Sequence, residues 1–408
     1  MSKLYVKEFG PIKSGLTEND GWLEFPKITL FCGQQASGKS SVAKLFSIMS
    51  WMEKQIYRDP ELALDETFFA HAIEWHGIES YLRPDTEIRY RGDLLCFDFA
   101  GGKVSASQVS DSNHLFIVPK ISYMPAERNF ASIVRNASRA EGLPNPLVDM
   151  QVEFSKARRF YQKGYKLPAN GFQFVFDNEP WIVNGHGEDA SRTRLESASS
   201  GLQSMVPLLL VSEYLAANLM DDDFRSMMGL FYDSGSADNK LRLEMRRNEI
   251  MNNPNLTVEQ KRGRLEQLVE PGKRFVNIVE EPEQNLYPAT QCELVSRLLS
   301  IANAKERNSL IVTTHSPYVH NHLILVAQAA AVLAEAGYNS DVAKKVSRII
   351  PVEACISGDV MAIYELQGDG SIHRIEPIDG LPSDNDPMNR QLAQFNSLFA
   401  NILEAQGN

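Results

Sequence analysis

One segment constrains the fold of this chain more than any other. Residues 33–40 read Gly-Gln-Gln-Ala-Ser-Gly-Lys-Ser and match the pattern GxxxxGK[ST] of the phosphate-binding loop, or P-loop. An apolar run over 28–32 precedes the segment, and apolar residues at helical spacing follow it as far as Met49. Because strand, glycine-rich loop and helix in this order are the context in which the pattern binds phosphates, the segment predicts an α/β fold of the P-loop type.

The residue types of this loop suit ATP with Mg²⁺. The glycines let backbone N–H groups turn toward an anion, and the N-terminus of the following helix adds partial positive charge. We expect Lys39 to reach the β- and γ-phosphates and Ser40 to ligate Mg²⁺. The alternative is a glycine turn before a surface helix, which the preceding strand disfavours. The expected phosphate-binding residues are Gly33, Gln34, Gln35, Ala36, Ser37, Gly38, Lys39, Ser40 and Ser41.

Composition limits the class of protein. The chain has 408 residues, enough for two to four domains at roughly 100–200 residues each. An apolar share of 43% and a charged share of 23% are ordinary for a soluble protein. The formal net charge is −11, so a general nucleic-acid coat is excluded, although a local basic face is compatible with it.

Cysteine usage and the apolar stretches indicate a reducing compartment. The four cysteines lie far apart and form no CxxC pair, so we expect neither a disulfide framework nor a zinc site. The first residues look like a strand and lack the apolar core of a signal peptide. The longest apolar stretch, 323–334, is interrupted by Gln328 and is too short for a bilayer. We therefore expect a soluble, cytoplasmic protein without a membrane contact.

Two acidic residues follow a second apolar run. Residues 275–279, Phe-Val-Asn-Ile-Val, look like a strand buried in a parallel sheet, and Glu280 and Glu281 come directly after them. This is a Walker B pattern: the first acid would hold Mg²⁺ directly or through water, and the second would orient and deprotonate the attacking water. Two exposed acids at a strand end are the alternative, which the P-loop upstream disfavours.

A third apolar run and a serine-rich segment complete the set. Residues 310–312 are apolar and are followed by Thr-Thr-His-Ser-Pro, with the histidine at position 315. Ser199, Ser200 and Gly201 precede an apolar helical stretch over 202–219. Small hydroxyl residues and glycine at a helix N-terminus can bind an anion. Taken alone, this segment would be interpreted as a plain serine-rich helix cap.

In this order, the four segments resemble those of the ABC ATPase superfamily. Residues 198–202, Ala-Ser-Ser-Gly-Leu, are similar to its signature loop LSGGQ, with Ala198 in place of leucine and Ser200 in place of the first glycine. The resemblance implies that Ser199, Ser200 and Gly201 contact the γ-phosphate bound by another subunit. It also implies that His315 is the switch histidine, which contacts the γ-phosphate and the attacking water.

A narrower resemblance is to the OLD-type group of SMC-like ATPases (the overcoming-lysogenization-defect group, of AAA type). Residues 280–288, Glu-Glu-Pro-Glu-Gln-Asn-Leu-Tyr-Pro, are similar to the EEPE..L.P form of Walker B in that group, and Phe9-Gly10-Pro11-Ile12 fits its opening. The group includes ATPase subunits of bacterial anti-phage systems such as Septu, PARIS and some retrons. The resemblance implies ATP hydrolysis, a homodimer or higher homo-oligomer, and a separate effector protein of nuclease or Toprim type.

The chain departs from this group at two places. No Q-loop glutamine is evident, and Met-Pro-Ala-Glu-Arg stands at its place over 124–128. Either Glu127 or Arg128 takes that role, or the two belong to an ordinary salt bridge. OLD nucleases carry a Toprim domain after the histidine strand, but no Glu and DxD set on successive strands stands out here. Asp384-Asn385-Asp386 is interpreted as a turn before a final helix.

The motifs extend from residue 33 to residue 315, so one ATPase domain must be assembled from both ends of the chain. We expect an ABC-type domain with a mixed or parallel sheet and helical insertions. Hairpins are expected over 172–183 and 360–376, and a final helix over 389–404. The expected division is 1–129, 196–233 and 273–408 for the ATPase domain, 130–195 for a first insertion, and 234–272 for a charged helical insertion.

Two further features have competing interpretations. His320 and His322 are taken as a solvated helix start rather than a metal cluster, because no ligand spacing matches. Residues 135–166 hold seven Lys and Arg residues with Phe160, Tyr161 and Tyr165 between them. They would suit a nucleic-acid backbone and its bases. A solvated helix face over core aromatics is favoured, because charge runs are usually solvated.

Three functions are compatible with these motifs. In the first, nucleotide-driven head-to-tail assembly of an ATPase controls a separate effector, a nuclease, in anti-phage defence. In the second, a DNA-repair or chromosome-type ATPase acts directly on nucleic acid, but the chain lacks the long heptad coiled coil of an SMC arm. In the third, ATP serves a non-hydrolysing scaffold, against which the presence of Lys39, Glu281 and His315 argues. An importer ATPase is disfavoured by the missing Q-loop glutamine.

Overall fold

The computed structural model describes most of the chain. The described residues are 1–59, 62–109, 118–134, 142–169, 171–185, 190–218, 251–253, 256–257, 261, 273–375 and 387–405. Most of the expected insertion 234–272, the Asp384-Asn385-Asp386 segment, and Arg135 and Arg139 lie outside the described residues.

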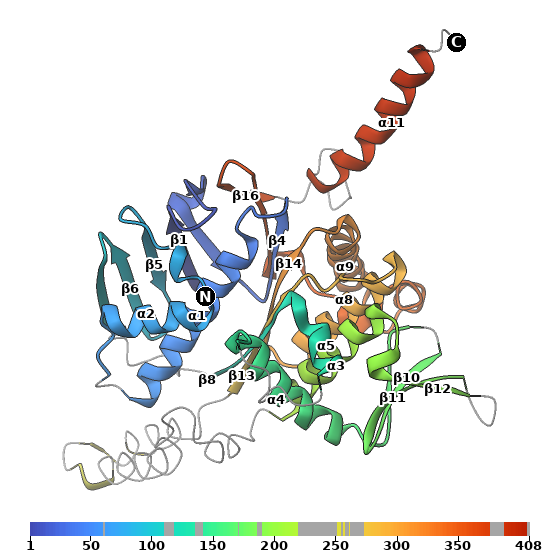
Figure 1. Ribbon diagram of the computed structural model, residues 1–408, viewed down its shortest axis with the longest axis horizontal. Coiled ribbons are helices and arrows are strands. Elements are labelled where there is room, and N and C mark those ends of the chain that lie inside the picture. The colour runs from blue at the N-terminus through green and yellow to red at the C-terminus, as the bar shows by residue number, and fades with distance from the viewer. Residues whose placement is uncertain are drawn as a thin grey trace.

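A seven-stranded sheet forms the centre of the molecule, in the order β2-β16-β15-β4-β14-β13-β8 (Figure 1). Five adjacent strands, from β15 to β8, are parallel, whereas β16 is antiparallel to β15. The expected α/β fold with a mixed sheet is therefore confirmed. The strands of this sheet are β2 (Gly15–Leu16), β4 (Ile28–Gly33), β8 (Val118–Met124), β13 (Lys273–Glu280), β14 (Ser309–Thr314), β15 (Met361–Leu366) and β16 (Ser371–Ile375).

The apolar runs form this sheet because both of its faces are buried. Neighbouring side chains on one strand alternate between the two faces. Leu310 and Val312 enter one hydrophobic core, and Ile311 between them enters the other. A strand buried on both faces needs apolar residues at every position, which explains the uninterrupted runs in the sequence.

A second sheet and two helices cover one face. The helix α1 (Lys39–Arg58) begins directly after the P-loop, and its Val42, Leu45 and Met49 pack into the core that contains Ile311. An antiparallel sheet in the order β3-β1-β5-β6-β7 and the helix α2 (Glu66–Trp75) complete this side. The strands of this sheet are β1 (Ser2–Lys7), β3 (Trp22–Phe25), β5 (Glu87–Arg91), β6 (Leu95–Ala100) and β7 (Lys103–Gln108).

Helices cover the opposite face. Among them, α5 is apolar around most of its circumference, as expected for a helix inside a core. Phe154 and Phe174, from the expected insertion 130–195, are buried in the same core as α5. Residues on this side form α3 (Phe130–Ile133), α4 (Asn145–Phe160), α5 (Ser200–Ala217), α8 (Pro288–Asn303), α9 (Pro317–Ala336), α10 (Asp341–Val346), and the strands β9 (Tyr165–Lys166), β10 (Phe172–Asp177), β11 (Glu179–Asn184) and β12 (Ser191–Arg194).

The expected local elements are present. The hairpins β10–β11 and β15–β16 are antiparallel pairs. The final helix, α11 (Pro387–Ala405), leaves the body of the molecule (Figure 1). Its first turn is attached to α9 by two hydrogen bonds between the amides of Asn321 and Asn389, and its Phe399 is 63% exposed.

One described helix, α9, is long and apolar enough to cross a membrane by length and composition alone. The same test is passed by the core helices of soluble proteins. Val319, Leu323, Val326 and Leu333 of α9 belong to the buried core. Packing against the sheet is thus a sufficient reason for its composition.

Candidate nucleotide-binding site

The strand order brings the motifs to one edge of the sheet. β4, β14, β13 and β8 are consecutive parallel neighbours. Their carboxyl ends carry, in this order, the P-loop, His315, the two acids and the segment that follows Met124. Ligands of open α/β sheets bind at this edge. Segments almost three hundred residues apart are thereby placed side by side, with Thr314 opposite Cys32 and Glu280 opposite Thr313.

The loop has the backbone that its glycines predict. Gly33 and Gly38 have φ angles of 134° and 101°, and Ala36 has a φ of 59°. A Cβ atom on Gly33 would collide with the Leu366 carbonyl of the neighbouring strand β15, and one on Gly38 would lie 2.8 Å from a side-chain carbon of Ile12. Both glycines are therefore required by conformation and by space.

Lys39 lies across the loop. Its side chain is only 5% exposed, and Nζ donates to the carbonyls of Gly33 (3.1 Å) and Gln34 (2.6 Å). Burial lowers the pKa of Lys39 to about 8, against the opposing effect of Glu281. Its cation is thus held at the mouth of the loop, where the phosphates of a nucleotide would replace carbonyl oxygens as partners.

Lys39, His315 and Glu281 form a chain of contacts. His315 Nδ1 lies 3.4 Å from Lys39 Nζ, and His315 Nε2 lies 3.3 Å from Glu281 Oε1. An imidazole that accepts at Nδ1 and donates at Nε2 satisfies both contacts, a tautomer assigned from the hydrogen-bond pattern. The hydrogen bond from His315 lowers the pKa of Glu281. Glu281 is therefore a carboxylate at neutral pH and can accept a hydrogen bond from water.

Glu280 is buried beside this chain, and its carboxylate has two partners. Tyr123 donates its hydroxyl to Oε1 (2.6 Å), and the Ala126 N–H donates to Oε2 (3.2 Å). Each carboxylate oxygen retains a further acceptor position. Glu280 is thus oriented by the end of β8, and Tyr123 is a site residue that sequence reasoning missed.

Two more site residues were missed or misassigned. The Glu283 side chain accepts a hydrogen bond from the His315 N–H (2.7 Å) and so fixes the start of the segment after β14, while burial raises the pKa of Glu283. Arg128 is in no ion pair among the described residues, which argues against the alternative of an ordinary salt bridge with Glu127. Its guanidinium instead donates to main-chain carbonyls, including those of Glu280 and Glu281.

The serine-rich segment lies at the N-terminus of α5, apart from the P-loop. Ser199 and Ser200 are exposed, and the Ser199 side chain makes no capping hydrogen bond, contrary to the plain helix-cap interpretation. Gly201 is buried, and a Cβ atom on it would lie 2.6 Å from the carbonyl oxygen of Asn285. Among the described residues, this segment makes no hydrogen bond to the P-loop of its own chain.

The available ligands fit ATP with Mg²⁺. No group of three or more His, Cys, Asp or Glu side chains in the described residues could hold a metal by itself. Mg²⁺ bound with a nucleotide needs no such group, because phosphate oxygens and water supply most of its ligands. Ser40, at the first turn of α1, and the buried Glu280 are the side chains that the sequence motifs predict as its protein ligands. When bound, the ion neutralises the charge that develops on the phosphates.

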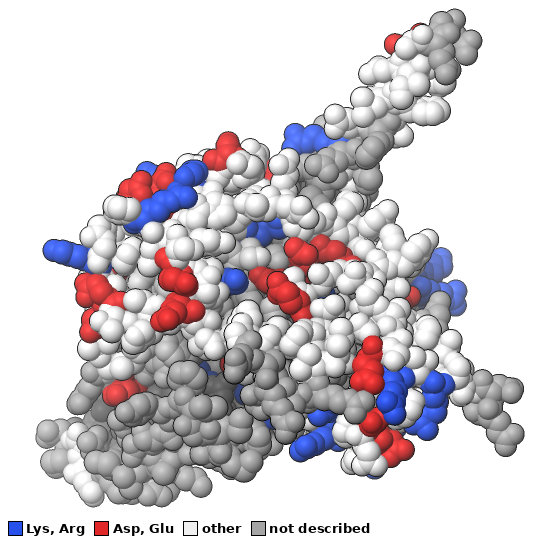
Figure 2. Space-filling view, viewed as in Figure 1, with Lys and Arg blue, Asp and Glu red and all other residues white. Residues whose placement is uncertain are grey.

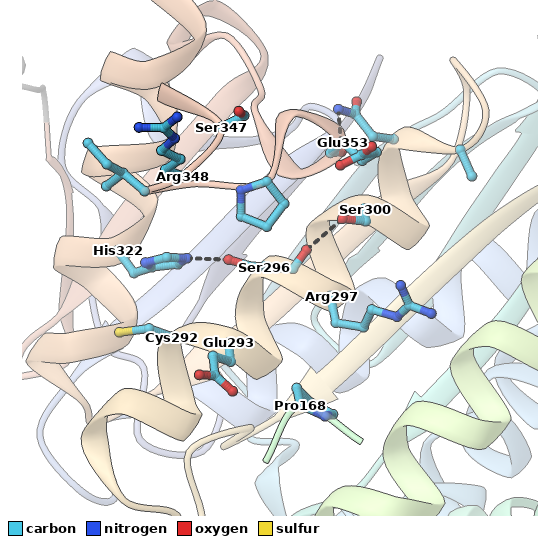
Figure 3. A pocket seen from close by; sticks show the side chains of 14 residues that line it. Pro168, Cys292, Glu293, Ser296, Arg297, Ser300, His322, Ser347, Arg348 and Glu353 are labelled. Carbon is cyan, nitrogen blue, oxygen red and sulfur yellow. Dashed lines mark hydrogen bonds between the residues drawn. The ribbon is translucent and has the colours of Figure 1, made fainter. Parts of the chain in front are cut away.

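The expectation of a solvated helix start at His320 and His322 is wrong. Both side chains are buried, because they lie on the face of α9 that packs against the core. His322 contacts Ser296 Oγ at 2.7 Å, and burial lowers the pKa of His322 to about 4. His322 borders a cavity of about 1000 Å³ that is lined mainly by α8, α9 and the segment after α10 (Figure 3). None of the motif residues lines this cavity.

The described part of the basic and aromatic stretch is divided between the core and the surface. Tyr165 is buried in the core, and Arg158 lies 5.3 Å from the ring centre of Phe176. Phe160 is exposed, as are the basic residues Arg159, Lys163 and Lys166. Figure 2 shows basic and acidic side chains interspersed over one face of the molecule, without a continuous basic band there. This distribution gives no support to binding of a nucleic-acid backbone on that face.

Comparisons with known proteins find structural similarity only. No protein-family model matches the chain, and no curated protein sequence matches it. Among solved structures, the SMC head domain from Thermotoga maritima superimposes with a TM-score of 0.35 and 11% identity, covering 78% of this chain and 90% of that one. The SmcHead bound to the C-winged helix domain of ScpA gives a TM-score of 0.37 and 11% identity, covering 91% and 96%. The Smc head domain with an extended coiled coil, bound to the C-terminal domain of ScpA derived from Pyrococcus furiosus, gives 0.36 and 10%, covering 92% and 96%.

Proposed function

We propose that this chain binds and hydrolyses ATP with Mg²⁺ as an ABC/SMC-like ATPase. The observation that carries the proposal is the contact chain from Lys39 through His315 to Glu281, which joins residues from three different strand ends. Phosphoryl transfer to water needs groups that bind the phosphates and a group that orients the water. A P-loop lysine, a histidine and a carboxylate at one edge of a parallel sheet can supply them. A scaffold that only binds ATP would not need the ionised Glu281 carboxylate held by His315 beside the loop.

Each residue has a role in this proposal. The P-loop amides and Lys39 bind the phosphates, and Ser40 and Glu280 hold the metal. His315 contacts the γ-phosphate and the attacking water. Glu281 orients that water and accepts its proton, since its carboxylate is ionised and half-exposed at the mouth of the loop.

Assembly would complete the site. Ser199 and Ser200 are exposed at a helix N-terminus and make no hydrogen bond to their own P-loop among the described residues. They are therefore available to the γ-phosphate bound by a second copy, in a head-to-tail dimer or a higher homo-oligomer. The buried position of Gly201 against Asn285 gives that glycine a role within its own chain as well.

The finer function follows from the motif resemblance alone. This resemblance assigns the protein to bacterial anti-phage defence. There, nucleotide-driven assembly would control a separate effector, a nuclease or Toprim protein. The expected insertions would report the nucleotide state to this partner, and the protein would act in the cytoplasm.

The first test is hydrolysis. We expect the purified chain to hydrolyse ATP with Mg²⁺ and Glu281→Gln to reduce turnover by about 10²–10⁴, the usual scale for loss of a general base. Nucleotide binding should persist in Glu281→Gln but be largely lost in Lys39→Ala. Normal turnover by folded Glu281→Gln would contradict the assigned role of that residue.

The second test is assembly. Light scattering should show ATP-dependent dimers or higher oligomers, most clearly for Glu281→Gln, because hydrolysis no longer removes the bridging nucleotide. In that background, Ser200→Arg should prevent assembly and retain nucleotide binding. Ser105→Arg, which adds the same charge on the exposed strand β7, is the control. A strictly monomeric enzyme with full activity would refute the shared site.

A further inference from the structure

Arg128 has an unusual environment for an arginine. Its side chain is 0% exposed. One terminal nitrogen donates to the carbonyl of Glu280 (2.6 Å) and to that of Pro125 (3.3 Å), and the other donates to the carbonyl of Glu281 (2.6 Å). Burying a guanidinium with backbone partners alone is costly, and the surrounding acids, Glu283 first, offset only part of this cost.

The backbone that Arg128 contacts is strained. Glu281 has a φ of 43°, which is rare for a residue with a side chain. Its N–H is bonded to the Thr313 carbonyl of β14 at 2.8 Å, and its own carbonyl is bonded to Arg128. Such a conformation persists only when its surroundings fix it, and here both sides of the residue are fixed.

We propose that Arg128 is a positioning residue for the two acids: by holding their main-chain carbonyls, it directs the Glu281 carboxylate toward His315 and the P-loop. Arg128 itself reaches no nucleotide, because it is fully buried and its bonded nitrogens are directed at backbone. The planar guanidinium can serve two carbonyls at fixed separation, which a lysine ammonium cannot reproduce. For its kinetic consequence, the inference rests on the proposed ATP hydrolysis.

Arg128→Lys is the main variant, because it keeps the positive charge and loses the fork. We expect kcat to fall about ten- to hundred-fold, since a misplacement near 1 Å can cost 10²-fold, while the Kd for ATP stays within about three-fold. Arg128→Met tests the loss of charge, and thermal melting establishes that each variant is folded. Arg158→Lys, a half-buried arginine beside Phe176, is the matched control and should have the kcat of the wild type.

A double-mutant cycle separates positioning from general stability. If Arg128 acts through Glu281, Arg128→Lys should lower the residual kcat of Glu281→Gln by less than about three-fold. Full kcat in folded Arg128→Lys would overturn the proposal. So would a parallel loss of ATP affinity, which indicates contact with the nucleotide, or an effect that simply adds to that of Glu281→Gln.

A measurement without ATP distinguishes this inference from the proposed function. The His315 ring signal in an NMR spectrum, identified by its loss in His315→Gln, reports the contact with Glu281. It should move in Arg128→Lys and in Glu281→Gln, and should be unchanged in Arg158→Lys. An unmoved signal in Arg128→Lys overturns the positioning role even if ATP is hydrolysed. A moved signal supports that role even if the wild type hydrolyses no ATP, a result that refutes only the proposed function.

Discussion

Nucleotide binding should take up a proton at Lys39. Burial lowers the pKa of this ammonium group to about 8 in the free protein, so that its neutral form is populated above pH 8. Phosphate groups placed against it favour the charged form and raise its pKa. Affinity is then full below pH 7 and declines as the pH rises through 8, because part of the binding free energy must protonate the side chain.

The size of the effect follows from the pKa. With a free-state value of about 8, about nine in ten molecules carry a charged Lys39 at pH 7 and about one in ten at pH 9. If the complex is fully protonated, affinity at pH 9 should be about ten-fold weaker than at pH 7. The same linkage predicts uptake of about 0.9 proton per site at pH 9 and about 0.1 at pH 7.

Isothermal titration calorimetry with Mg²⁺ and ADP measures both the affinity and the proton uptake. ADP is used because it lacks the γ-phosphate whose hydrolysis would disturb the titration. Titrations in buffers of different ionisation enthalpy give the proton uptake at each pH. Lys39→Met is the control, with weak binding that does not depend on this ionisation. Constant affinity from pH 7 to 9, or the same pH dependence in Lys39→Met, would refute the account of Lys39.

Two further predictions concern the loop and the output. Gly33→Ala should lower the melting temperature more than Gly77→Ala and should also weaken ATP binding. Both glycines have positive φ, which costs alanine about 1–2 kcal/mol, but only at Gly33 would the added Cβ meet a carbonyl. Equal melting temperatures of the two variants would contradict this. The purified chain should cleave neither DNA nor RNA. Deletion of 240–266, which lies mostly outside the described residues, should spare ATP binding and weaken the effector complex. Nuclease activity that a point change in this chain removes would contradict the assignment of cleavage to a separate effector.

The local elements could be predicted because their signals are local. Glycine spacing and one apolar run were sufficient for the turn at Gly33 and the helix after it, and continuous apolar residues were sufficient for strands β13 and β14. The prediction that His322 is solvated failed because it used only the local sequence around the start of the helix. Polar residues near a helix start suggest solvent, but α9 is placed with that face against α8, where Ser296 meets the imidazole. The domain division remains a prediction.

By itself, the sequence determined which residue types follow each strand: a P-loop after β4, two acids after β13 and a histidine after β14. Only the tertiary structure decided what those residues contact. The order of the strands in the sheet places β8 next to β13, so Tyr123 and Arg128 reach acids more than 150 residues away in the sequence. The physical reason is that glycine turns and apolar periodicity act over a few residues, whereas strand pairing depends on the burial of the whole sheet. The hydrogen bonds from the Arg128 guanidinium to two main-chain carbonyls leave no signal in the local sequence, because every residue has a backbone carbonyl that could accept them.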